Sequence, residues 1–154
     1  MKIALGSDHR GLVVANALVN HLRAEGHEVE VLGECNATSC DYPDVAWLVG
    51  RAIADARVDR GILICGTGIG MCIAANKIHG IRAAMAQDEL SAQLSRTHND
   101  ANVLCLSADL IGQTLAKRVV DVWTKTQFEG GRHQRRLNKI AAIERGEDPV
   151  VVRA

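Results

Sequence analysis

Aromatic residues and prolines are scarce in this chain, and neither sign of charge is in excess. Phe, Trp and Tyr make up 3% of the 154 residues and there are two prolines, so the core must be built mainly from Ala, Val, Ile and Leu. Lys and Arg number 18 and Asp and Glu number 18, which leaves no net charge to attract nucleic acid or a membrane surface. No apolar run reaches the roughly 18 residues that a membrane-spanning helix needs.

The five cysteines contain no C-x-x-C pair. This absence argues against a thioredoxin-type centre and against a zinc knuckle. The first residues, MKIALGSDHRG, carry neither a long apolar stretch nor a small-residue cleavage site, so we expect a cytoplasmic protein whose cysteines are reduced. Cys72 and Cys105 fall in apolar runs and are expected to be buried as small hydrophobic residues.

Short apolar runs alternate with helical patterns along the chain. This alternation, with strands that are almost continuously apolar, predicts an α/β fold: a Rossmann-like three-layer sandwich with a five-stranded parallel sheet and a C-terminal helix. Because there is no repeat or linker, we expect one domain over residues 1–154, with a loose tail from about 147. The expected strands are Lys2–Leu5, Glu28–Leu32, Ile62–Cys65, Ile81–Ala86 and Val103–Leu106, and the expected helices are Leu12–Arg23, Pro43–Arg57, Gly70–Ile78, Glu89–Thr97, Gly112–Thr126 and Gln134–Arg145.

Ligands of open parallel sheets bind beyond the carboxyl ends of the strands. The sequence places Asp8 after the first strand and Cys65 at the end of the third, and the loop before Pro43 brings Tyr42 to the same edge. A dinucleotide is not expected, because the first strand ends in GSDHRG rather than G-x-G-x-x-G and puts a carboxylate where a pyrophosphate would lie. The P-loop pattern is also absent.

The stretch ILICGTGIG, residues 62–70, runs an apolar strand into a glycine turn with a thiol at the junction. Backbone amides at the start of the following helix suit a phosphate or a developing oxyanion. The same positive end favours the thiolate of Cys65, which would make it a base or a nucleophile. The alternative, a cysteine that only packs at the end of the strand, has equal weight from position alone.

Two further candidates lie away from this edge. His98, in SRTHNDAN, precedes the fifth strand and so belongs to the opposite edge, from which it reaches a cysteine only across a two-fold dimer. Its alternative role is a helix-end cap. Arg132 and Arg136 are spaced i, i+4 and share a helical face that suits a dianionic phosphate, although such a run is usually a solvated basic face.

Together these residues resemble the type B ribose-5-phosphate isomerases, a family that also includes galactose-6-phosphate isomerase subunits. The matching stretches are GSDHRG, CDYPD, ILICGTGIGMCIAANK, GIRAA, SRTHNDANVL and EGGRHQRR, in order between residues 6 and 136. The resemblance implies an aldose–ketose isomerase, without a metal or other cofactor, that interconverts D-ribose 5-phosphate and D-ribulose 5-phosphate through an enediolate. It also implies a homodimer or tetramer in which each site is shared between subunits.

The resemblance assigns roles to individual residues. Cys65 matches the base that moves a proton between C1 and C2, and His98 matches the residue that helps to open the furanose ring. Asp8 matches a residue that binds sugar hydroxyls. Thr67 and the amides of Gly66, Gly68 and Gly70 match the loop that stabilises the enediolate, His9, Arg132 and Arg136 match phosphate ligands, and Tyr42 and Asn99 match substrate contacts.

Two departures keep the substrate open. Some relatives use a glutamate farther along the loop in place of the cysteine, but GMCIAANK has no acid, which leaves Cys65 as the base. Asp109, in SADLIG, stands where many relatives have arginine, which indicates weaker phosphate binding or another substrate. The alternatives are an isomerase of allose 6-phosphate, galactose 6-phosphate or a tetrulose phosphate, and a non-catalytic sugar-phosphate-binding module. The length of the sugar substrate would be set by the last helix and by the loop between Gly33 and Tyr42.

Overall fold

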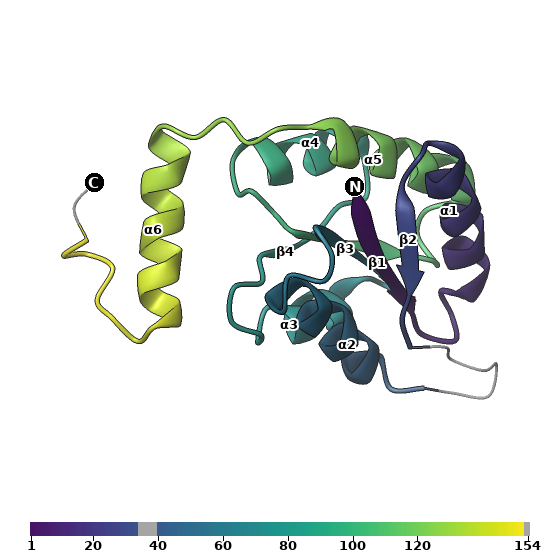
Figure 1. Ribbon diagram of the computed structural model, residues 1–154, viewed down its shortest axis with the longest axis horizontal. Coiled ribbons are helices and arrows are strands. Elements are labelled where there is room, and N and C mark those ends of the chain that lie inside the picture. The colour runs from purple at the N-terminus through teal and green to yellow at the C-terminus, as the bar shows by residue number, and fades with distance from the viewer. Residues whose placement is uncertain (34–39, 153–154) are drawn as a thin grey trace.

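The structure, a computed structural model, describes residues 1–33 and 40–152 (Figure 1). Five parallel strands form one sheet in the order β2-β1-β3-β5-β4, which confirms the predicted fold class. This order places the ends of β1, β3 and β5 next to one another in the middle of the sheet. The strands are β1 (Lys2–Ser7), β2 (Glu28–Val31), β3 (Arg60–Cys65), β4 (Ala83–Met85) and β5 (Val103–Ser107).

Helices cover both faces of the sheet, and the last helix, α6, stands beside the three layers (Figure 1). One face carries α1 (Leu12–Ala24), α4 (Glu89–Thr97) and α5 (Gln113–Lys125), and the other carries α2 (Tyr42–Ala54) and α3 (Ile69–Ala75). The chain then leaves α5 and forms α6 (Arg132–Glu144). No helix in the described ranges combines the length and the apolar character that spanning a membrane requires.

Alternate residues of the strands feed two apolar clusters, one on each face. On β3, Ile62 and Ile64 pack with the α1 and α5 side, whereas Leu63 and Cys65 pack with the α2 and α3 side. Because both faces of the central strands are covered, most of their positions are apolar, which explains the hydrophobic runs in the sequence. Trp123 on α5 is fully buried and completes the first cluster.

The third helix and the fourth strand are shorter than predicted, and Asn76 explains both boundaries. Its Oδ1 accepts from the Ala83 amide at 2.8 Å and its Nδ2 donates to the Ala83 carbonyl at 2.9 Å. The side chain of Asn76 therefore bonds to the backbone of β4 where α3 ends. The second helix also stops early, at Ala54, and two residues later Ala56 has a positive φ of 54° that is incompatible with a continuing helix.

Truncation of Leu104 tests the core on the α1 and α5 side. Leu104 is fully buried in β5, so Leu104→Ala should lower the free energy of unfolding by about 2–5 kcal/mol. Leu110→Ala is the matched control, because Leu110 is 62% exposed and its truncation should change stability by about 0.5 kcal/mol or less. Urea denaturation of both variants measures the difference, and equal losses would contradict the placement of β5 in the core.

Candidate active site

Cys65 is the last residue of β3, and its sulfur receives a backbone hydrogen bond from the glycine turn. The Gly68 amide donates to Cys65 Sγ at 3.1 Å, and Cys65 is buried, with 4% of its surface exposed. Gly68 adopts a φ of +78°, and a Cβ at this position would lie 3.1 Å from the carbonyl carbon of Leu106. Only glycine combines this left-handed backbone with so close an approach, so the turn places an amide donor on the thiol.

Contacts from the end of β5 fix the same turn. The Ser107 hydroxyl donates to the Gly66 carbonyl at 2.6 Å, and the Asp109 amide donates to the same carbonyl at 3.0 Å. The Ala108 amide donates to the carbonyl of Cys65 at 2.9 Å. Because the end of β5 and the two residues after it hold the carbonyls of Cys65 and Gly66, the backbone that carries the thiol is fixed.

Asp8 and Tyr42 lie at the same edge, as the sequence predicts. Asp8 is buried after β1, and its Oδ1 accepts from the amides of Arg10 at 2.9 Å and Gly11 at 3.0 Å. These bonds orient the carboxylate. The Tyr42 ring lies against the glycine turn, since a Cβ on Gly70 would be 2.7 Å from its Cε2 atom. His9 and Thr67 are exposed beside this group, and Gly66 is buried within it.

An ion pair that sequence reasoning missed crosses the turn. Arg10 donates to Asp109 Oδ2 through Nη2 at 2.7 Å and Nε at 3.2 Å. A Cβ on Gly66 would lie 2.8 Å from Arg10 Nε and 2.9 Å from Asp109 Oδ2, so the pair packs directly on this glycine. The unexpected carboxylate of Asp109 is therefore balanced by a guanidinium from the loop after β1.

His98 lies at the opposite edge of the sheet, in the segment that precedes β5. It caps α4, where its amide donates to the Leu94 carbonyl at 3.0 Å, and its ring stacks on that of His133 with centroids 4.2 Å apart. The Glu129 amide donates to the Thr97 carbonyl at 3.1 Å, which ties the start of α6 to the end of α4. This arrangement brings His98, Asn99, Arg132 and Arg136 into one region, with the exposed Asn99 next in the chain.

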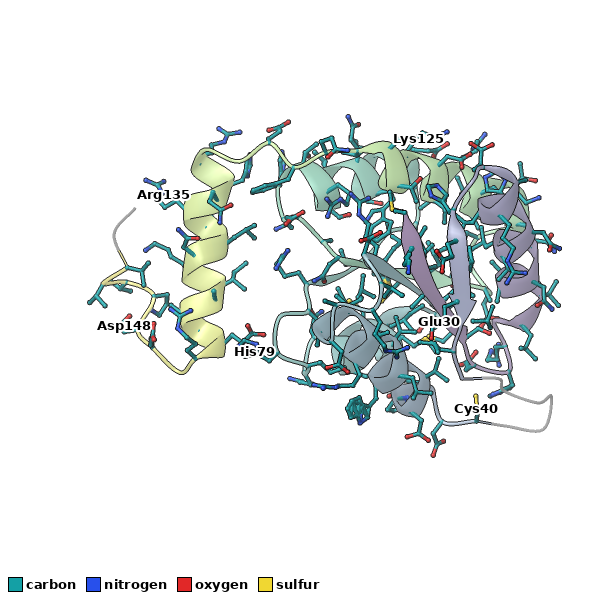
Figure 2. All side chains as sticks on the ribbon, viewed as in Figure 1. Glu30, Cys40, His79, Lys125, Arg135 and Asp148 are labelled. Carbon is teal, nitrogen blue, oxygen red and sulfur yellow. The ribbon has the colours of Figure 1, made fainter. Side chains whose placement is uncertain are left out.

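His133 was not singled out from the sequence, although EGGRHQRR contains it. The side chain is 3% exposed, and Arg132 Nε lies 3.4 Å from its Nε2 atom. Burial, followed by the charges of His98, Arg132 and Arg136, lowers the pKa of His133 below its ordinary value. By contrast, Arg135 points away from the body of the molecule, as expected of a solvated face, and Lys139 donates to the Pro149 carbonyl at 2.8 Å (Figure 2).

His98, Glu129 and His133 offer ligand atoms that all lie within 4.8 Å of one another, so they could hold a metal ion. Two features disfavour a metal ion at this place. The two rings are parallel within 7°, so their nitrogen lone pairs run side by side rather than converging on one point. The guanidinium of Arg132 also lies beside His133, and that charge repels a metal dication.

The cysteines follow the expectations only in part. Cys105 is fully buried and Cys72 is partly buried, and both are free thiols, as is Cys65. Cys40 is disulfide-bonded, so the expectation that all five cysteines are reduced was wrong. Cys35, most of the loop between Gly33 and Tyr42, and the last two residues of the tail lie outside the described residues.

Comparison with known proteins identifies the family of this chain. The family model described as Ribose/Galactose Isomerase matches residues 3–140. The chain belongs to this family. Ribose-5-phosphate isomerase B of Escherichia coli is 50% identical over 143 residues, which cover 93% of this chain and 96% of that protein.

Two other family members extend the comparison to substrates. D-erythrulose-4-phosphate isomerase of Pectobacterium atrosepticum is 41% identical over 148 residues, which cover 96% of this chain and 97% of that protein. The solved structure of ribose-5-phosphate isomerase B from Mycoplasma genitalium, with bound ribulose-5-phosphate, has a TM-score of 0.87 and 44% identity, and covers 94% of this chain and 96% of that one.

Proposed function

We propose that this chain interconverts D-ribose 5-phosphate and D-ribulose 5-phosphate through an enediolate. The observation that carries this proposal is the Gly68 amide donating to Cys65 Sγ at 3.1 Å, at the strand edge that also holds Asp8 and Tyr42. A thiol in this setting is suited to remove a proton next to a carbonyl, because the amide supports the negative sulfur. The relative that binds ribulose-5-phosphate supplies the substrate class.

The proton transfers follow from this geometry. The Cys65 thiolate removes the proton from C2 of the open-chain aldose, and the released electron pair forms the C1–C2 double bond while O1 becomes the oxyanion. A proton then passes from O2 to O1, and the Cys65 thiol returns its proton to C1, which leaves a ketone at C2. The Gly68 amide already acts on the sulfur, so Thr67 and the amides of Gly66 and Gly70 are the donors left for the oxyanion.

The remaining roles belong mainly to the residues at the opposite edge of the sheet. His98 assists the opening of the furanose ring, Asn99 contacts the sugar, and Arg132 and Arg136 bind the phosphate. His9, from the edge that holds Cys65, is a further phosphate ligand. Two guanidiniums one helical turn apart match the geometry of a dianion. Asp8 keeps Oδ2 for a sugar hydroxyl, because Oδ1 accepts from the loop amides.

We further propose that a second copy of the chain completes each site, in a homodimer or in a tetramer built from such dimers. His98 and Cys65 lie at opposite edges of one sheet, so they meet only if a partner contributes one of them. An incompletely filled face supports this. Ile140 and Ile143 on α6 are 45% and 59% exposed, and they line a cavity of about 530 Å³ with Asn99 and residues around β4.

We expect the enzyme to work in the cytoplasm.

The alternative is the same isomerisation on another sugar phosphate. The D-erythrulose-4-phosphate isomerase relative shows that family members with this degree of similarity include an enzyme named for a four-carbon substrate. The Arg10–Asp109 ion pair at the glycine turn favours keeping this alternative, because the Asp109 carboxylate neutralises the Arg10 guanidinium at the turn. Assays with six-carbon and four-carbon sugar phosphates beside ribose 5-phosphate decide between them.

Replacement of Cys65 tests the base. Cys65→Ala should lower kcat for ribulose 5-phosphate formation by about 10²–10⁴-fold, the usual contribution of a general base, while substrate still binds. Cys72→Ser is the control, because Cys72 lies on α3 with its sulfur bonded toward β4 rather than at the turn. Turnover of Cys65→Ala near the wild-type rate would remove the thiol from the mechanism.

Replacement of Arg136 tests the phosphate contact. Arg136→Ala should raise KM by about 10–100-fold with a smaller change in kcat, because a charged hydrogen bond to phosphate contributes similar binding in the ground and transition states. Arg135→Ala provides the matched control, since Arg135 is on the same helix but points away from the body of the molecule (Figure 2). Equal effects of the two substitutions on KM would show that only general charge matters.

A further inference from the structure

Arg82 directly precedes β4, and its guanidinium holds the loop that carries His98 and Asn99 before β5. The two loops lie side by side because β4 and β5 are neighbours in the sheet. Arg82 Nε donates to the carbonyls of Asn99 and Asp100, both at 3.1 Å, and Nη2 donates to the Asp100 carbonyl at 2.8 Å. One side chain therefore fixes two consecutive carbonyls in the residues that follow His98.

The backbone of Arg82 is itself anchored. Its amide donates to Asn102 Oδ1 at 2.8 Å, and the Asn102 amide donates to the Arg82 carbonyl at 3.1 Å. Asn102 Nδ2 donates to the Gly80 carbonyl at 2.9 Å, and the Gly80 amide donates to Glu144 Oε1 on α6 at 2.8 Å. The guanidinium of Arg82 thus acts from a fixed base, unlike a long side chain that is free in solvent.

Asp100 has a backbone conformation that its surroundings must hold in place. Its φ is +44°, in the left-handed region that residues other than glycine adopt at a cost. Its Oδ2 accepts from Arg82 Nη2 at 2.9 Å, and its Oδ1 lies 2.8 Å from Nη1 of Arg96. Arg96 is 5% exposed and also donates to the Ala101 carbonyl at 2.7 Å. Unfavourable backbone held by several charged contacts is typical of functional sites.

We propose that Arg82 is a positioning residue for His98 and Asn99, with Asp100 as the anion that orients its guanidinium. The proposal rests on the proposed isomerase function, in which His98 assists ring opening and Asn99 contacts the sugar. Arg82 Nε and Nη2 are engaged by the loop, so Arg82 acts through these two residues. Because proton transfer needs hydrogen-bond distance to the sugar, a small displacement of the loop lowers turnover.

Arg82→Lys is the test variant. Lysine keeps a positive charge beside Asp100 but lacks the planar fork, so it cannot hold two carbonyls and a carboxylate together. The Arg82 side chain is 31% exposed, and we expect the variant to fold. Arg57→Lys is the matched control, because Arg57 donates to Glu30 at 2.8 Å in an exposed ion pair elsewhere on the surface.

The stacked rings of His98 and His133 report the position of the loop without any substrate. Their centroids are 4.2 Å apart in the wild type, so their ring protons should give a nuclear Overhauser effect. This effect should be weakened or lost in Arg82→Lys and unchanged in Arg57→Lys. An unchanged effect in Arg82→Lys would overturn the proposal, whether or not the chain isomerises ribose 5-phosphate.

Kinetics test the consequence for catalysis. Arg82→Lys should lower kcat on ribose 5-phosphate by about tenfold or more, a loss on the scale of small displacements at a catalytic group. In a chain that also carries His98→Ala and Asn99→Ala, the same substitution should change kcat by less than about twofold, because Arg82 then has nothing to position. A tenfold loss in that background, or no loss in the wild-type background, would overturn the positioning role.

Discussion

Parallel strands impose the constraint on which the rest of this structure depends: all loops that follow strands share one edge of the sheet, and all loops that precede strands share the other. Asp8 and Cys65 follow β1 and β3, whereas His98 and Asn99 precede β5. Central strands of five and six residues hold the two edges about 17–20 Å apart, too far for one sugar phosphate to span. The proposed second copy follows from this separation, because it is the way to bring both edges to one substrate.

Within the first edge, the glycine turn converts a packed cysteine into a candidate base. Gly68 takes a backbone conformation that other residues adopt at a cost, and Ser107 and Asp109 hold the Gly66 carbonyl from the neighbouring strand. The donor on Cys65 Sγ is thus part of the fold before any substrate arrives. Such preorganisation is what makes hydrogen-bond donors effective in a site from which water is largely excluded.

The sequence was informative wherever a residue's environment depends on its place along one strand or helix. Continuous apolar runs predicted a sheet covered on both faces, and strand ends placed Asp8, Tyr42 and Cys65 at one edge, as observed. Pairings between distant segments were not predictable in this way. Arg10 and Asp109 are 99 residues apart, and nothing local to either residue indicates the other. The stacking of His98 on His133 depends on how the segment before α6 docks, and the short β4 depends on Asn76.

The measurement that tests the two-copy site most directly is the activity of a mixed dimer of Cys65→Ala and His98→Ala chains, isolated through two different affinity tags and assayed with ribose 5-phosphate. If each site combines Cys65 of one chain with His98 of the other, the mixed dimer has one complete site and one doubly altered site. It should then recover about half of the wild-type activity, although both parent dimers are impaired. A mixed dimer no more active than its parents would contradict the shared site and place Cys65 and His98 in separate functions.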